Sequence, residues 1–128
     1  MLVDKTHRAL IERYLAAYNT FDVPGMLAVL HRDVAFENIA GGAVTTAAQG
    51  REEFRALAEH AATLFTSRHQ AIRQYVPTSD GARVEIEYEG VLAADLGPDL
   101  RAGTTLRLAG RSLFEIRDGC IVRIVDES

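Results

Sequence analysis

The sequence predicts an α+β protein in which helices come first and a mainly antiparallel sheet follows. Before Phe65 the apolar residues recur every three or four positions, which is the period of a helix. From Ser67 onward they alternate with polar residues, as in a strand with one buried face. No linker, repeat or low-complexity tract separates these two parts. We therefore expect a single domain over residues 1–128, which is long enough to bury a core without crosslinks.

Three helices are expected in the first half of the chain. The first covers residues 4–19, and its apolar face is Leu10, Ile11, Tyr14, Leu15 and Tyr18. The second is short: Asp22 can cap its start, Pro24 suits its first turn, and it is expected to end at His31. The third begins after Gly50, and its apolar face is Phe54, Leu57, Ala58, Ala61, Leu64 and Phe65.

Five strands are expected from alternation and turn residues. One early strand covers residues 34–38, and residues 43–49 are expected to form a loop. The later strands are expected over residues 67–78, 83–93, 104–117 and 120–125. Turns at residues 79–81 and 118–119 would join two pairs of them as hairpins.

Charged residues mark one face of the predicted sheet. Glu85, Glu87 and Glu89 alternate along one strand, and Arg107 and Arg111 alternate along the next. Cross-strand ion pairs on a solvated face explain this pattern better than an ion-binding site does, with a polar subunit interface as a variant. The same face also carries apolar side chains, which are Val91, Ala109 and Leu113, and we predict that a homodimer forms through it.

Composition and charge exclude several classes of function. The net charge of −4 is unsuited to binding nucleic acid, because no basic excess can displace counterions from phosphates. No apolar run is long enough to cross a membrane, and the N-terminal stretch lacks a signal-peptide core, so we expect a cytoplasmic protein. Cys120 is the only cysteine, and the four histidines lack metal-ligand spacing, so no metal and no cofactor are expected.

The stretch from Tyr14 to Asn38 has the pattern YxxxYNTFDxxGMxxxxHxDVxFEN. With the order of elements, this pattern resembles the superfamily of nuclear transport factor 2, ketosteroid isomerase and SnoaL-type polyketide cyclases. The resemblance covers nearly the whole chain. It implies a cone-shaped fold, in which three N-terminal helices pack in a strongly curved, mixed and mostly antiparallel sheet. It also implies a deep apolar pocket at the open end and dimers through the outer sheet face.

The resemblance does not extend to the isomerase mechanism. In the isomerases a Tyr and a protonated Asp hold the substrate oxygen while a second Asp moves the proton. Tyr14 falls at the position of that Tyr, but Asn38 and Ser112 fall at the positions of the two acids. An amide cannot act as a general base near neutral pH. The acid and the histidine of the SnoaL-type cyclases have no assigned counterpart in this chain.

The residues by themselves point to the same positions. Tyr14, Asn38 and Ser112 are polar, yet each lies on a face that its neighbours mark as apolar. Buried polar groups need a partner in the protein, water or a ligand. The predicted pocket is therefore lined by Tyr14, Tyr18, Phe36, Asn38, Phe54, Leu57, Ser112 and Phe114, and would bind a small hydrophobic molecule with one oxygen.

Structural explanations compete with this pocket. The tyrosines can be ordinary core residues, Asn38 can bond the loop at Gly41, and Ser112 can simply allow close packing. His60 lies on the flank of the third helix, where a proton-transfer role is a minor alternative. His69 has no assigned role.

Two classes of function remain open. The first is an enzyme acting on a small molecule, which could be an isomerase, cyclase, dehydratase or hydrolase. The second is a non-catalytic ligand-binding or dimerisation module of the same fold. An acid facing the pocket would favour the enzyme. The alternation identifies none, because Glu37 and Glu115 are expected to face outward.

Overall fold

A computed structural model describes residues 2–128, with side chains from Lys5 onward. The first half contains α1 (Leu2–Asn19), α2 (Val23–Ala28), β1 (Leu30–Ala40), β2 (Ala43–Gln49) and α3 (Arg51–Ala62). The second half contains four strands, which are β3 (Phe65–Pro77), β4 (Gly81–Leu92), β5 (Thr105–Arg117) and β6 (Cys120–Glu127).

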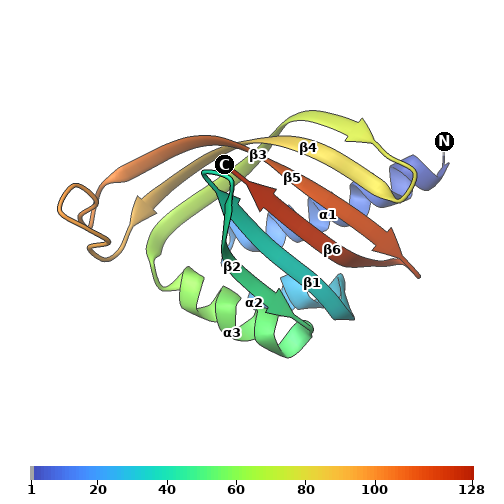
Figure 1. Cartoon of the computed structure of the whole chain (residues 1–128), viewed down its shortest axis with the longest axis horizontal. Helices are drawn as coiled ribbons and strands as arrows, with labels where there is room; N and C mark the ends of the chain where they lie inside the picture. Colours follow the sequence, from blue (N-terminus) through green and yellow to red (C-terminus); the bar gives the residue numbers. More distant parts are fainter. Residues whose placement is uncertain (1) are drawn as a thin grey trace.

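The strands form one curved sheet of six strands in the order β2-β1-β6-β5-β4-β3, with the helices on its concave side (Figure 1). β1 and β6 are parallel, and every other neighbouring pair is antiparallel. α1 contacts β3, β4 and β6, whereas α3 contacts β1 and β2. This architecture confirms the predicted α+β fold with a mixed, mostly antiparallel sheet. None of the helices in the described part of the chain is both long and apolar enough to cross a bilayer.

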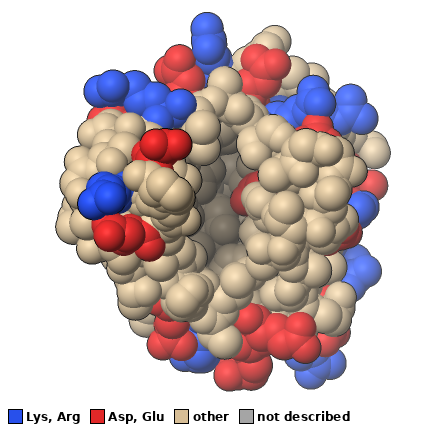
Figure 2. Space-filling model, turned by 60° about the vertical axis from the view of Figure 1, so that its left-hand side comes forward, with Lys and Arg blue, Asp and Glu red and all other residues tan. Residues whose placement is uncertain are grey.

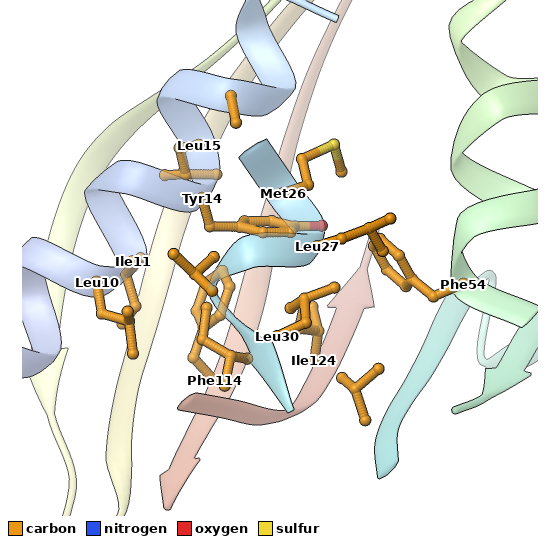
Figure 3. Packing of buried hydrophobic residues seen from close by; sticks show 14 of the residues in the cluster. Leu10, Ile11, Tyr14, Leu15, Met26, Leu27, Leu30, Phe54, Phe114 and Ile124 are labelled. Atoms are coloured by element: carbon orange, nitrogen blue, oxygen red, sulfur yellow. The ribbon is translucent and has the colours of Figure 1, made fainter. Parts of the chain in front are cut away.

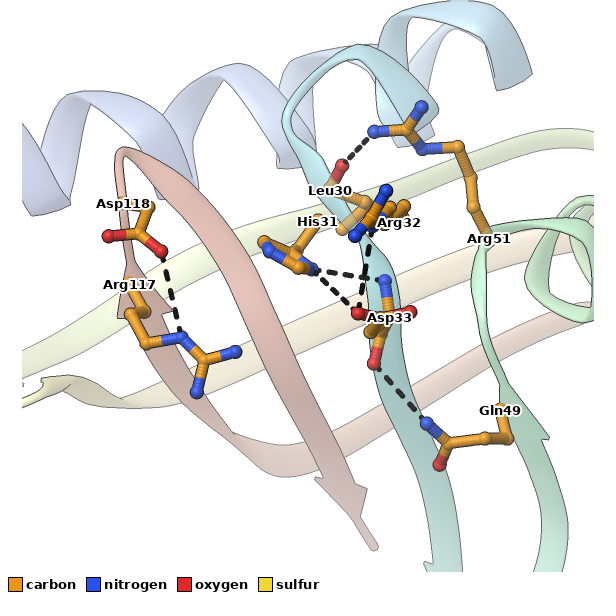
Figure 4. A network of polar contacts seen from close by, with 8 residues as sticks. All are labelled: Leu30, His31, Arg32, Asp33, Gln49, Arg51, Arg117 and Asp118. Carbon is orange, nitrogen blue, oxygen red and sulfur yellow. Dashed lines mark hydrogen bonds and ion pairs between the residues drawn. The ribbon is translucent and has the colours of Figure 1, made fainter.

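The second helix is shorter than predicted, and His31 belongs to a strand. Asp22 caps α2 as expected, with its carboxylate accepting a 3.0 Å hydrogen bond from the Gly25 N–H. The helix ends at Ala28, however, and β1 starts at Leu30, which pairs with Ile121 of β6. His31 Nδ1 accepts a hydrogen bond of 3.0 Å from the Asp33 N–H (Figure 4). The prediction of a helix end at His31 is wrong, because pairing with a distant strand outweighs local helix propensity.

The prediction of a loop over residues 43–49 is also wrong. These residues form the edge strand β2, which pairs with β1 from Ala35 opposite Gln49 to Ala40 opposite Ala43. Gly41 and Gly42 make the turn between the strands, both at positive φ. The small and polar residues of β2 carry a weak strand signal, so the partner strand determines its conformation.

The third helix ends earlier than its apolar spacing suggests. α3 stops at Ala62, and Phe65 begins β3 instead of extending the helix, while Leu64 lies between the two elements. The predicted start of α3 is correct, because Gly50 is the residue directly before its first turn. Short apolar runs at the boundary between a helix and a strand fit both periods.

The core lies between the three helices and the sheet. Figure 3 shows side chains from these elements converging on Tyr14 and Phe114. The largest fully buried side chains of this cluster include Phe114, Ile11, Leu30, Ile121 and Ile124. This core holds α1 across the sheet and leaves the space between α1, α3 and the open end of the sheet for a cavity.

The outer face of the sheet carries charged pairs, as predicted. Arg107 Nε donates a 3.0 Å hydrogen bond to Glu89, the residue opposite it on β4. Arg111 lies opposite Glu85 but donates to Glu127 of β6 at 2.6 Å. These side chains are exposed, so each pair contributes little stability, about 0–1 kcal/mol.

We predict that the protein forms a homodimer through this outer face. Leu113 is half-buried there without a partner chain, and apolar area of this kind favours association. Light scattering at micromolar concentration should give twice the mass of the chain. The variant Leu113→Arg should give the mass of the monomer, and a monomer mass for the unmodified protein would contradict the prediction.

Candidate functional site

The concave side of the sheet encloses an open cavity of about 440 Å³. Figure 2 shows it as a deep hollow whose walls are mostly uncharged, whereas charged residues surround its mouth. The walls come from α1, α3 and the inward faces of the strands. This volume is within the usual range for sites that bind small organic molecules, about 300–1,000 Å³.

Most of the predicted pocket residues lie in the wall of this cavity. They are Tyr14, Tyr18, Phe36, Asn38, Phe54, Leu57 and Ser112. Phe114 does not line it and is a core residue, only 1% exposed. Its ring packs against the ring of Tyr14, with centroids 5.9 Å apart, so Tyr14 separates it from the cavity. Alternation correctly placed Phe114 on the inward face but could not show that a helix side chain covers it.

Aromatic rings form much of the apolar wall. The Phe36 and Phe54 rings meet edge to face with centroids 5.6 Å apart, and Phe54 also lies 6.4 Å from Tyr14. Leu57 is half-buried on the same side of α3 as Phe54. Because these rings come from α1, α3 and β1, their contacts fix the width of the cavity at this end.

A row of polar residues crosses the sheet and faces the cavity. Asn38 of β1 lies beside Asp126 of β6, and Asp126 lies beside Ser112 of β5. On the other side, Asn38 pairs with Thr46 of β2. All four line the cavity. Neighbours across adjacent strands project from the same face of a sheet, so strand pairing alone brings these groups together.

Asp126 is the acid that the sequence analysis failed to identify. The Ser112 hydroxyl donates a 2.6 Å hydrogen bond to its Oδ1. Burial raises the pKa of its carboxyl group from 3.8 to about 6, despite the opposing effect of that bond. Its residual exposure is toward the cavity. The alternation that buries Ile124 extends two residues further to Asp126, but the predicted strand stopped at Val125, so this signal was overlooked.

The amide of Asn38 is engaged near the mouth of the cavity. Its Nδ2 donates a 2.9 Å hydrogen bond to Thr45 Oγ1, and Thr45 donates to the Asn38 carbonyl at 3.2 Å. These bonds join β1 to β2 and orient the amide. The predicted alternative, a bond to the loop at Gly41, is therefore replaced by bonds to a strand residue. The carbonyl oxygen of the Asn38 side chain accepts no hydrogen bond from the described residues.

The tyrosines of the cavity stay neutral. Burial raises the pKa of the Tyr14 hydroxyl well above 10, and the negative charge of Asp126 raises it further. Burial also raises the pKa of Tyr18, whose hydroxyl donates to the hydroxyl of Tyr88 at 3.1 Å. A hydroxyl that keeps its proton can donate to an oxygen on a ligand.

Arg68 of β3 is a second residue that sequence reasoning missed. It lines the cavity and is only 4% exposed. Its Nε donates a 3.0 Å hydrogen bond to the Tyr18 carbonyl at the end of α1. Its guanidinium lies 3.7 Å from the centre of the Tyr18 ring and 4.6 Å from that of Phe21. An arginine in an alternating strand is usually an outward residue, so the sequence pattern carried no signal for this placement.

The histidines considered from the sequence lie away from the cavity wall. His60 is exposed on α3 and His69 is exposed on β3, and neither lines the cavity. Among the described side chains, no group of three or more His, Cys, Asp or Glu is placed to hold a metal ion. The chemistry available in the wall is therefore that of Asp126, Arg68, the tyrosines and the neighbouring amide and hydroxyl groups.

The sequence and the fold have relatives among known proteins. The SnoaL-like domain matches residues 11–124, and the chain belongs to this family. No protein of curated function matches the sequence.

Solved structures share the fold over nearly the whole chain. A "putative polyketide cyclase" from Xanthomonas campestris pv. campestris is 27% identical, with a TM-score of 0.76 over 98% of this chain and 91% of that one. TerC, crystallised with polyporic acid, is 22% identical, with a TM-score of 0.76 over 94% of this chain and 89% of that one. A protein from Catenulispora acidiphila with a ketosteroid isomerase-like fold, in complex with trimethylamine, is 17% identical, with a TM-score of 0.75 over 91% and 82% of the two chains.

Replacing Asp126 should stabilise the protein in a pH-dependent way. The folded state holds the Asp126 proton more tightly than the unfolded chain does, so its contribution to stability is complete below pH 3.8 and disappears as the pH rises to about 6. Asp126→Asn should therefore raise the free energy of unfolding above pH 6, by about 1–2 kcal/mol once screening by water in the cavity is included.

This prediction is tested by urea unfolding at pH 4 and pH 8. The gain of Asp126→Asn should be larger at pH 8 than at pH 4. Asp99→Asn, a change at an exposed loop residue, serves as the control and should show no such difference. An equal gain at both values of pH would contradict a raised pKa at Asp126.

Proposed function

We propose that this protein is an enzyme that binds a small, largely apolar molecule in the cavity and moves a proton on it, with Asp126 as the general acid–base. Reactions of this class include isomerisation and the ring closures of cyclases. The observation that carries the proposal is Asp126 itself: a carboxyl group in an apolar cavity with a pKa of about 6. A general base works best when its pKa lies close to the working pH.

The groups around Asp126 suit this role. The Ser112 hydroxyl bonds Oδ1, which orients the carboxylate and leaves Oδ2 without a hydrogen bond from the described residues. As a base, Asp126 would remove a proton from a carbon next to a carbonyl group, and as an acid it would return the proton elsewhere on the same molecule. Negative charge then develops on the carbonyl oxygen of the substrate.

A neutral hydrogen-bond donor in the cavity can stabilise that oxygen. The Tyr14 hydroxyl is a suitable donor because its raised pKa keeps it protonated, and it lines the same cavity as Asp126. This arrangement uses the tyrosine that the isomerase resemblance indicated. It places the acid on the last strand, however, and not at Asn38 or Ser112. The similarity to the "putative polyketide cyclase" of the same fold supports this class of chemistry.

The proposal can be tested with a generic probe for a carboxylate base in an apolar site. The probe is 5-nitrobenzisoxazole, a planar aromatic molecule. A base removes the proton from C3, the C–H electrons form the nitrile, and the N–O bond breaks to release a coloured phenolate. The rate should rise with pH through an apparent pKa of about 6, because the ionised form of Asp126 is the base.

The test compares two neighbouring acids of β6 whose side chains lie on opposite faces of the sheet. Asp126→Asn should lower the rate by about 100-fold or more, in line with the usual contribution of a general base. Glu127→Gln is the matched control, because Glu127 follows Asp126 in β6 but pairs with Arg111 on the outer face of the sheet. Equal rates for wild type and Asp126→Asn would refute the proposal and favour the non-catalytic ligand-binding module.

A further inference from the structure

Arg68 is a buried cation with an incomplete set of partners. It is the most deeply buried charged residue among the side chains that the structure describes. The Tyr18 carbonyl accepts from Nε, but the buried Nη2 has no hydrogen-bond partner. No Asp or Glu in the described part of the chain lies within ion-pair distance of Arg68. The guanidinium is therefore charged, desolvated and without a counter-ion.

This state is costly for the folded protein. A guanidinium cannot lose its proton at ordinary pH, so burial cannot be relieved by neutralisation. The rings of Tyr18 and Phe21 offset part of the cost through cation–π contacts. These ring contacts do not provide a hydrogen-bond acceptor for the N–H groups of Nη2. Buried charges in proteins are normally paired, so an unpaired one in the wall of a cavity points to a partner that enters the cavity.

A purely structural role explains only part of this arrangement. Through Nε, Arg68 fastens the end of α1 to β3, and Asn19 does the same by exchanging hydrogen bonds of 2.7 and 3.2 Å with the Gln70 backbone. A neutral donor could hold the Tyr18 carbonyl without the cost of a buried charge. Holding the end of α1 in place does not require a guanidinium in the cavity wall, and this placement is the feature left unexplained.

We propose that Arg68 binds a carboxylate on the ligand, and that the ligand is therefore a planar apolar acid. A carboxylate is the acceptor whose two oxygens match the parallel N–H groups at the end of a guanidinium. The aromatic rings of the wall suit a flat apolar body next to that group. The inference rests on the proposed function for the cavity as the ligand site and adds the chemical class of the molecule that enters it.

The charges of the cavity would fix the orientation of such a ligand. Arg68 faces the cavity from β3 and Asp126 faces it from β6, and the two form no ion pair with each other. A carboxylate held by Arg68 would keep away from ionised Asp126. The ligand would then enter in one direction, with its carboxylate on Arg68 and its reacting carbon toward Asp126. Electrostatic complementarity of this kind mainly provides specificity and register.

The test compares two probes with the same ring system and similar shape, of which one carries a negative charge and the other is neutral. They are 2-naphthoate and its neutral analogue 2-naphthamide, and their dissociation constants are measured by calorimetry at pH 7. Wild type should bind the naphthoate at least tenfold more tightly. Arg68→Gln should remove this preference, and Arg68→Lys should retain part of it because the charge remains. The ratio of the two constants within one variant is insensitive to a general loss of stability.

Two arginines provide matched controls. Arg111 borders the cavity, but its side chain lies on the outer face of the sheet, where it is exposed and paired with Glu127. Arg51 bonds the Leu30 carbonyl at 2.6 Å, much as Arg68 bonds that of Tyr18, and it does not line the cavity (Figure 4). Arg111→Gln and Arg51→Gln should both keep the preference for the naphthoate. Loss of the preference in either variant to the same extent as in Arg68→Gln would overturn the assignment to Arg68.

The outcomes separate this inference from the proposed function. Equal affinity of wild type for the two probes would overturn the carboxylate site and leave the cavity as a site for neutral apolar molecules. Binding of neither probe would overturn both the cavity as a ligand site and the inference that rests on it. If Arg68→Gln does not fold, the wild-type ratio and Arg68→Lys still decide the outcome.

Discussion

The parallel pairing of β1 with β6 is the contact on which the site depends. It joins the first strand of the chain to the last, and the alignment of Leu30 with Ile121 buries both side chains completely. Further along the same ladder it sets Asn38 beside Asp126. Parallel strands cannot be joined by a tight turn, and here most of the remaining chain lies between the two strands. The packing of a buried core therefore positions the acid of the cavity.

The cavity holds two groups that are unfavourable for folding. Burial raises the pKa of Asp126, so its carboxyl group ionises less readily than in water. Arg68 remains charged without a counter-ion. At either position, an apolar side chain of similar size would cost the folded state less free energy than the buried polar group does. Proteins depart from the rules of stable packing mainly at functional sites, where binding or chemistry makes use of the departure. The occurrence of both costs in one cavity distinguishes it from the remainder of the core, whose largest members are apolar.

The sequence predicted local features well wherever one period dominates. The apolar face of α1, the cap at Asp22 and the hairpin turn at Asp118 all follow from residue type and spacing. It failed at His31 and over Ala43–Gln49, where short segments have no strong preference of their own. There the hydrogen bonds of a neighbouring strand determine the structure, and those bonds come from distant parts of the chain.

The sequence by itself determined the class of fold and many of the inward-facing side chains in the elements with a clear period, because both follow from local periodicity. It could thus identify Tyr14, Asn38 and Ser112 as polar groups on apolar faces. Only the tertiary structure decided which inward faces meet, and it placed Asp126 and Arg68 in the cavity wall and Phe114 behind Tyr14. The physical reason is that cavity walls are built from non-local contacts. Strand order, register and the position of a covering helix determine these contacts, and none of them is encoded in the period of a single element.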